Sequence, residues 1–285
     1  LWPDTIRLSL LNFQSQSVDK LEVKMSLPAT PDAAMQTIGQ LAGRLLSHHT
    51  IDPAQLCGVS VSTSGIVDYH TNTLKFNSLS PSWGSDIPVA ELLQPYFAPG
   101  TPILVENVAK VVGRSILHNP EYQDKRVLAV FSSWGGICAC FIDHDRILNG
   151  VNSLIGEIGH MVLDPDSTVT CGCGNYGCFE RLASTEQLRA YVAGTISQHP
   201  DSIVNHLSVP ELHISDIFSA SALADPYAQS ISARLGRYFA LALRNITLCF
   251  DPEVVVFHGD FAAADDHFRQ TIMQKLAASR YYPKA

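Results

Sequence analysis

Positive charge is scarce in this chain and is nowhere concentrated. The 285 residues include 19 Lys and Arg against 27 Asp and Glu, which gives a formal net charge of −8. No five consecutive residues are basic. Proteins that bind nucleic acid need a basic surface for the phosphates. We therefore expect this chain by itself to bind DNA poorly.

Long apolar runs are also missing. No stretch of about 18 consecutive apolar residues occurs, although a transmembrane helix needs that length. The first four residues, LWPD, lack the basic region and the apolar core of a signal peptide. These absences predict a cytoplasmic protein without a membrane partner. Because the chain opens on Leu1 rather than Met, we expect its true beginning to lie upstream.

What is present is enough apolar sequence for a buried core, since 46% of the residues are hydrophobic and 16% are charged. A chain of this length typically folds as one large or two medium domains, and we expect two. Strand-like and helix-like segments alternate, which favours an α/β fold. The expected strands are 6–13, 21–27, 58–61, 103–105, 127–131, 138–142 and 254–258. The expected helices are 33–46, 109–117, 231–248 and one that begins with a capping box at 184–187 and runs to about 192.

Cysteine is concentrated in one short segment. Of the seven cysteines, Cys171, Cys173 and Cys178 lie within residues 170–184, TCGCGNYGCFERLAS. In a reducing cytosol an odd number of cysteines indicates thiols or metal ligands rather than a disulfide framework. The intervening glycines allow the backbone to fold tightly enough to bring three sulfurs together.

The nearest imidazole upstream of these cysteines is His160, in the segment GEIGH at 156–160. Three thiolates and one imidazole would complete a tetrahedral Zn²⁺ site. Because no position would remain for an activated water, we predict a structural rather than a catalytic zinc. The alternative is a glycine-rich loop whose thiols are simply buried.

These motifs carry a family resemblance. The segments GEIGH (156–160) and CGCGNYGCFE (171–180) resemble the signature of the ROK family of repressors and sugar kinases, and SGIVD (64–68), VEN (105–107) and DPEVVV (251–256) are similar to other family motifs in the same order. The resemblance implies a two-domain, actin-like (ribonuclease-H-like) ATPase fold with a structural zinc. It also implies a smaller domain at 1–107, a larger domain at 108–285 that carries the zinc loop and the oligomerisation surface, and a homodimer or homotetramer.

A ROK kinase needs a carboxylate that takes a proton from the sugar and glycine-rich turns whose N–H groups bind ATP phosphates. The carboxylate is the Asp of Glu-Asn-Asp-Ala-Asn, but residues 106–110 are ENVAK and place Val108 there. The turns depart as well: the resemblance places Trp134, Trp2, Pro3 and His258 at or beside expected glycines. Because catalysis needs all of these parts together, we expect no kinase activity.

The sugar-contacting positions of the family are better preserved. The resemblance implies that Asn107, Glu157, His160 and Glu180 bind sugar hydroxyls, with His160 also a zinc ligand. The carboxylates and the amide supply the acceptors and donors that a polyol requires. The alternative is that Glu157 and Glu180 are ordinary solvated surface acids.

The sequence therefore predicts the sugar-sensing and oligomerising region of a ROK-type transcriptional regulator that binds a sugar without phosphorylating it. In family repressors a helix-turn-helix precedes the core, so we expect DNA contact only through a segment absent from this chain. The family's last strand and helix are also expected beyond Ala285. Two alternatives stay open: an ATP-dependent sugar kinase of the same family, and an orphan sugar- or metal-binding protein without a DNA-binding arm.

Overall fold

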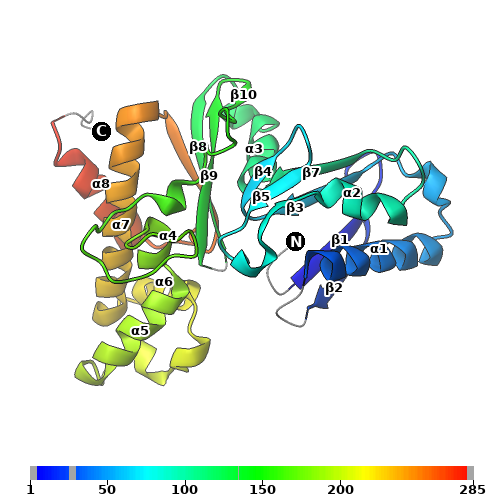
Figure 1. Cartoon of the computed structure of the whole chain (residues 1–285). Coiled ribbons are helices and arrows are strands. Elements are labelled where there is room, and N and C mark those ends of the chain that lie inside the picture. Colours follow the sequence, from blue (N-terminus) through cyan, green and yellow to red (C-terminus); the bar gives the residue numbers. More distant parts are fainter. Residues whose placement is uncertain (1–4, 26–29, 134, 281–285) are drawn as a thin grey trace. The chain divides into compact units, whose positions relative to one another are not determined.

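The computed structural model describes residues 5–25, 30–133 and 135–280. Contacts divide these residues into two compact units (Figure 1). The first contains the described residues up to Val111 together with Gly150–Leu154, and the second contains Val112–Asn149 and the described residues from Ile155 onward. The domain boundary at residue 107 that the resemblance implied remains a prediction.

The first unit contains three small sheets. Strands β1 (Thr5–Leu11) and β2 (Ser17–Lys24) form an antiparallel pair, and β3 (Val59–Thr63) pairs in parallel with β7 (Ile103–Asn107). The third sheet is antiparallel and consists of β4 (Ile66–Asp68), β5 (Thr73–Phe76) and β6 (Ser85–Ile87). Strand β7 ends at Asn107 and the next helix begins at Val108, so the ENVAK segment (106–110) spans the junction between the strand and the helix.

Helix α1 (Pro31–His48) is the main helix of the first unit. Thr30 caps it by accepting a hydrogen bond from the backbone N–H of Ala33, and Pro31 begins the helix where its missing N–H costs nothing. Its buried side chains recur at helical spacing, and four of them pack in one core with α2 (Val89–Leu93): Ala34, Met35, Ile38 and Leu41.

A four-stranded sheet forms the centre of the second unit, in the order β10 (Arg146–Ile147), β9 (Gly136–Asp143), β8 (Arg126–Ser133) and β11 (Val254–Gly259). Strands β8 and β9 form an antiparallel hairpin, and β11 lies parallel to β8. The helices of this unit are α4 (Phe179–Leu182), α5 (Thr185–Thr195), α6 (Ile214–Ala222), α7 (Pro226–Phe250) and α8 (Asp266–Ala277), and α3 (Val108–Leu117) enters it from the first unit.

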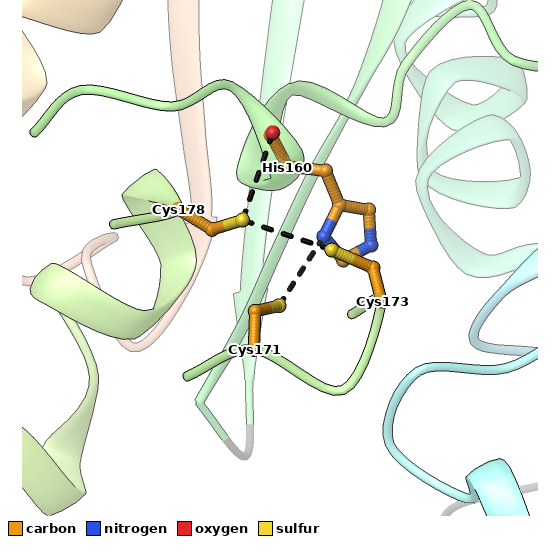
Figure 2. A group of neighbouring side chains, drawn as sticks. All are labelled: His160, Cys171, Cys173 and Cys178. Carbon is orange, nitrogen blue, oxygen red and sulfur yellow. Dashed lines mark hydrogen bonds between the residues drawn. The ribbon is translucent and has the colours of Figure 1, made fainter. Parts of the chain in front are cut away.

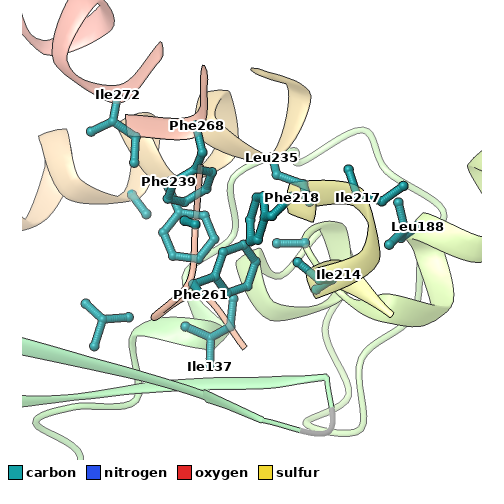
Figure 3. Close-up of a cluster of buried hydrophobic side chains, with 14 of the residues drawn as sticks. Ile137, Leu188, Ile214, Ile217, Phe218, Leu235, Phe239, Phe261, Phe268 and Ile272 are labelled. Carbon is teal, nitrogen blue, oxygen red and sulfur yellow. The ribbon is translucent and has the colours of Figure 1, made fainter. Parts of the chain in front are cut away.

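The two faces of β9 pack against different helices. Ile137 and Ala139 belong to the core beneath α7, whereas Cys140 faces α3 at Gly113, where any side chain would overlap its sulfur. An aromatic cluster on α7, α8 and the turn after β11 fills the first of these faces (Figure 3). The ring centroids of Phe239 and Phe261 lie 4.3 Å apart, and those of Phe239 and Phe268 lie 5.0 Å apart. Such pairs of buried rings stabilise the core beyond the area that they bury.

The remaining helices are single turns of 3₁₀ type. They are η1 (Pro53–Gln55), η2 (Pro81–Trp83), η3 (Gln94–Tyr96), η4 (Pro120–Tyr122), η5 (Ile158–His160), η6 (Ile196–Gln198), η7 (Ile203–His206) and η8 (Val209–Glu211). Within the described ranges, no helix has both the length and the apolarity to cross a membrane.

The predicted elements are largely confirmed. The seven expected strands fall on β1, β2, β3, β7, β8, β9 and β11, and the four expected helices fall on α1, α3, α5 and α7. The expected strand 6–13 was too long, because β1 ends at Leu11 and the Asn12 side chain accepts from two backbone N–H groups of the following turn. The expected strand 21–27 was shifted along the chain, because β2 spans Ser17–Lys24 and Met25 is not part of it; residues 26 and 27 lie outside the described residues.

Candidate metal centre and its surroundings

The cysteine segment forms a tight loop that precedes α4. The N–H of Cys171 donates to the carbonyl of Asn175 at 2.8 Å, and isolated bridges join Thr170 to Tyr176 and Val162 to Cys178. Gly177 has a φ of +63°, and a side chain there would overlap the carbonyl oxygen of Asp164. Glycine is therefore a geometric requirement at position 177 of this loop.

This fold gathers the four predicted metal ligands into one cluster that could hold a metal ion (Figure 2). One ligand atom from each of His160, Cys171, Cys173 and Cys178 lies within 4.8 Å of all the others. The Sγ of Cys171 is 3.6 Å from Nδ1 of His160, and the Sγ atoms of Cys173 and Cys178 are 3.7 Å apart. The Sγ of Cys178 also lies 3.7 Å from the backbone oxygen of His160.

Two thiols of the cluster, those of Cys171 and Cys178, have raised pKa values and resist ionisation. Burial is the main cause that raises the pKa of Cys171 above its ordinary value, and the neighbouring Glu180 carboxylate adds to this. Burial, followed by the contact with Cys173, raises the pKa of Cys178 to about 11. Thiolates are the metal-binding form of cysteine, so a cation that binds here must displace protons from these sulfurs.

Glu180 connects the cluster to the central sheet. It lies in the first turn of α4 and is only 4% exposed. Its Oε2 accepts from the N–H of Ile137 at 3.3 Å, and its Oε1 lies 3.3 Å from Sγ of Cys171 and 3.5 Å from Nδ1 of His160. The alternative that Glu180 is a solvated surface acid is therefore wrong.

His160 and Glu157 lie at the other edge of the cluster. Glu157 immediately precedes η5, and His160 is the last residue of that turn. The imidazole directs Nδ1 toward Cys171, while Nε2 lies 3.7 Å from Oε2 of Glu157. Both side chains are only partly buried, with exposed fractions of 21% for His160 and 18% for Glu157. The same ring thus faces the thiols on one side and a carboxylate on the other.

Asn107 lies in the first unit, at the junction of β7 and α3. It is 5% exposed; its Nδ2 donates to the carbonyl of Gly65 at 2.7 Å and its Oδ1 accepts from the N–H of Ala109 at 2.8 Å. Each of these groups retains the capacity for one more hydrogen bond. Val108, at the position of the kinase carboxylate, is the first residue of α3 and is 9% exposed.

The sequence prediction gave no role to Lys110, two residues further along α3. Its side chain is 3% exposed, and among the described residues its Nζ has no hydrogen-bond partner. Its Nζ lies 6.0 Å from the ring centroid of Tyr69. The only sequence signal is the presence of a lysine where the family motif ends in Asn, because burial cannot be inferred from a single charged residue.

By the family resemblance, two of the turns that bind phosphate in the kinases correspond to the β8–β9 turn and the end of β11 in the second unit. Trp2, Pro3 and Trp134 lie outside the described residues, but Gly135 next to Trp134 has a φ of +78° at the turn between β8 and β9. At the end of β11, His258 is partly buried, and burial lowers its pKa. Among the residues that the structure describes, no hydrogen-bond partner faces the Nε2 of His258.

Comparison with known proteins covers nearly the whole chain. The profile of the ROK family matches residues 4–282. A glucokinase of Halalkalibacterium halodurans is 24% identical over 276 residues, which are 96% of this chain and 82% of that protein. A putative xylose repressor of Caldicellulosiruptor sp. is 22% identical over 284 residues, which are 97% of this chain and 69% of the repressor. Kinases and repressors are thus similar to this chain to nearly the same degree.

Among solved structures, a ROK family transcriptional regulator that is a homolog of E. coli MLC protein superposes with a TM-score of 0.81 at 20% identity. The match covers 98% of this chain and 68% of the regulator. The fold prediction is confirmed at this level: the chain has the actin-like ATPase type of α/β fold found in ROK sugar kinases and regulators.

Proposed function

Because the chain belongs to the ROK family, we propose that it is the sugar-sensing and oligomerising region of a cytoplasmic ROK-type transcriptional regulator. In this proposal it binds a sugar without phosphorylating it. The observation that carries the proposal is Val108, which stands at the position of the kinase carboxylate and begins α3 directly after Glu106 and Asn107. A valine cannot accept the proton of a sugar hydroxyl, so phosphoryl transfer lacks its general base.

The sugar-binding residues of the proposal are Asn107, Glu157, His160 and Glu180. Glu157 and His160 are partly exposed and contact each other, so both are accessible to hydroxyl groups. Glu180 is fixed by Ile137 and Cys171, which leaves its carboxylate in one orientation. Asn107 is fixed by Gly65 and Ala109 and offers one N–H and one lone pair. Fixed donors and acceptors favour binding because little side-chain entropy is lost.

We further propose that the cluster binds a structural Zn²⁺. With Zn–S bonds of about 2.3 Å and Zn–N bonds of about 2.0–2.1 Å, the edges of a tetrahedral site measure about 3.5–3.8 Å. The Sγ of Cys171 is 3.6 Å from the Nδ1 of His160, and the Sγ atoms of Cys173 and Cys178 are 3.7 Å apart. The types of donor atom and their spacing therefore fit this ion. Four protein ligands would leave no open position, and the ion would fix the loop that presents Glu180.

Through His160 the ion would also act on the ligand. If Nδ1 of His160 binds the metal, its Nε2 carries the proton and faces Glu157 and the ligand. Contacts of this kind beyond the metal orient the side chains around it. The zinc therefore has a role in the geometry of sugar binding and none in chemistry.

The regulatory part of the proposal is a shift between two conformations. A sugar that binds one conformation more tightly shifts the population toward it, by an amount set by the difference in affinity. DNA contact would come through a helix-turn-helix outside these 285 residues, in keeping with the net charge of −8. We propose a homodimer or homotetramer as the assembly that combines two such DNA-binding segments.

An ATP-dependent sugar kinase is the second candidate, because the glucokinase match extends over 96% of this chain. Isothermal titration with Mg-ATP, with and without sugar, and a coupled assay for sugar phosphate distinguish the two. The regulator proposal expects sugar binding without micromolar ATP binding and without product. Formation of sugar phosphate would replace it with the kinase.

A further inference from the structure

Lys110 is a buried cation that has no counter-ion among the residues that the structure describes. Its Nζ has no hydrogen-bond partner among the described residues, and no ion pair there includes it. The nearest carboxylate in sequence, Glu106, accepts from the N–H of Asn107 at 2.9 Å. The face of Tyr69 at 6.0 Å is a weak partner for an ammonium group. Buried lysines are normally paired, because an unpaired buried charge is costly.

The position of Lys110 in its helix makes its unpaired positive charge still less favourable. Lys110 is the third residue of α3, and the first turn of this helix contains no acidic residue. The N-terminal end of a helix carries a partial positive charge from its free N–H groups, and it favours anions and disfavours cations. Burial, the missing counter-ion and the helix end thus all indicate that an anion is to be bound here.

Asn107 relates this position to the proposed ligand site. Asn107 directly precedes α3 and accepts from the N–H of Ala109 in its first turn, and Lys110 is the third residue of the same helix, so both belong to the start of α3. Compared with the motif Glu-Asn-Asp-Ala-Asn, the segment ENVAK has lost a negative charge at Val108 and gained a positive charge at Lys110. Both changes favour a ligand that is itself negatively charged.

We propose that Lys110, with the start of α3, binds the oxyanion of an acidic monosaccharide, a carboxylate or a phosphate. The inference deepens the proposed sugar-sensing function and rests on it, since Asn107 is one of the sugar-binding residues. The ammonium of Lys110 neutralises one negative charge, which matches the single charge of a sugar carboxylate; a phosphate carries about −1.5 to −2 at neutral pH and would leave part of its charge to the helix N–H groups.

The test compares matched sets of sugars by isothermal titration with the full chain. Each set contains a neutral sugar, its uronate and its 6-phosphate: glucose, galactose and mannose with their derivatives. We expect one acidic member to bind about tenfold or more tightly than its neutral parent, as loss of a charge-assisted hydrogen bond would imply. Tighter binding of the uronate identifies the oxyanion as a carboxylate, and tighter binding of the 6-phosphate identifies it as a phosphate. If every neutral sugar binds as tightly as its acidic counterparts, the inference is wrong.

Substitutions assign the preference to Lys110. In Lys110→Met and Lys110→Asn, the acidic sugar should lose its advantage, whereas Lys20→Met, which changes an exposed lysine of β2, should retain it. Without ligand, Lys110→Met should melt at a higher temperature than the wild type, since it removes an unpaired buried charge. A preference that survives both Lys110 variants, or a lower melting temperature for Lys110→Met, would overturn the proposal.

Failure of the proposed function is a separate outcome. If no sugar of any set binds, sugar sensing by this chain fails, and acetate and inorganic phosphate then probe the anion site alone. Stabilisation of the wild type by one of these anions, absent in Lys110→Met, would keep the anion site without the sugar. No such difference would reject the anion site as well.

Discussion

The Oε1 of Glu180 lies 3.3 Å from the Sγ of Cys171, so a residue that we propose to bind the sugar is in direct contact with a residue that we propose to bind the metal. The two groups oppose each other electrostatically, because the negative charge of Glu180 is one of the causes, after burial, that raise the pKa of Cys171. A bound cation would relieve this opposition. We therefore expect the proposed metal site and the proposed sugar site to be coupled through this pair.

We predict that Glu180→Gln weakens sugar binding but retains the metal. The amide keeps the shape of the side chain and loses a charge-assisted hydrogen bond worth about 1.5–3 kcal/mol, while Cys171 loses a repulsive neighbour. The measurement is the sugar-induced rise in melting temperature together with metal content. Glu186→Gln is the matched control, because Glu186 lies in the same region, is 70% exposed and pairs only at the surface with Arg181. Equal shifts for both variants would exclude Glu180 from the sugar site.

A second prediction concerns the metal itself. The purified protein should contain about one zinc per chain, and Cys173→Ser should lose it and unfold at a lower temperature, because a closed metal site contributes folding free energy. Metal analysis and calorimetry provide the readout. Cys249→Ser changes an exposed cysteine outside the cluster and should leave both unchanged. Protein purified without chelators that carries no zinc would contradict the metal assignment.

The cluster of His160 with the three cysteines was predictable because its residues lie close together in the sequence. The spacing of Cys171, Cys173 and Cys178 and the intervening glycines are visible in the sequence, and His160 lies only eleven residues upstream. The contact of Glu180 with Ile137 was not visible, since it joins residues 43 positions apart. That these residues bind metal and sugar stays a prediction.

Among the secondary-structure elements, those with a clear local sequence pattern were predicted and those without one were missed. The strands β8 and β9 were predicted because their apolar residues form continuous runs, as expected for a buried hairpin. Strands β4 and β6 have three residues each, too few to show any period. Helix α8 was missed because only Phe268 and Ile272 of its twelve residues are buried, which makes its apolar face narrow. Lys110 was missed because lysines on helices are normally exposed.

A third prediction concerns stability in acid. Asp225 caps α7, and although burial opposes ionisation, hydrogen bonds from the N–H groups of Ala228 and Ile203 and the hydroxyl of Ser202 lower its pKa below 3.8. The folded pKa is lower than the unfolded one, so the contribution is present above pH 3.8 and is lost as the pH falls through the folded pKa.

Asp225→Asn should therefore reduce the free energy of unfolding at neutral pH by about 1–3 kcal/mol and should flatten the acid limb of the stability curve. Urea denaturation between neutral pH and pH 3 measures both effects. Asp201→Asn, at an exposed position nearby, is the control. An acid limb as steep in Asp225→Asn as in the wild type would assign the acid sensitivity to other carboxylates.

The last prediction concerns the absent kinase base. Val108→Asp should not create kinase activity, because the family resemblance implies that Trp134 and Pro3 stand where the phosphate-binding turns need glycine. The variant should fold, since an acid is favoured at the start of a helix. A carboxylate at this 9% exposed position must, however, be desolvated, and it should repel an acidic ligand, so sugar affinity should fall below that of Val108→Ala, which removes the same methyl groups without adding charge. A coupled assay with Mg-ATP and titration of the sugars measure the two effects. Sugar phosphate formed by Val108→Asp would show that the phosphate turns are intact, and the chain would then be a kinase that lacks only its base.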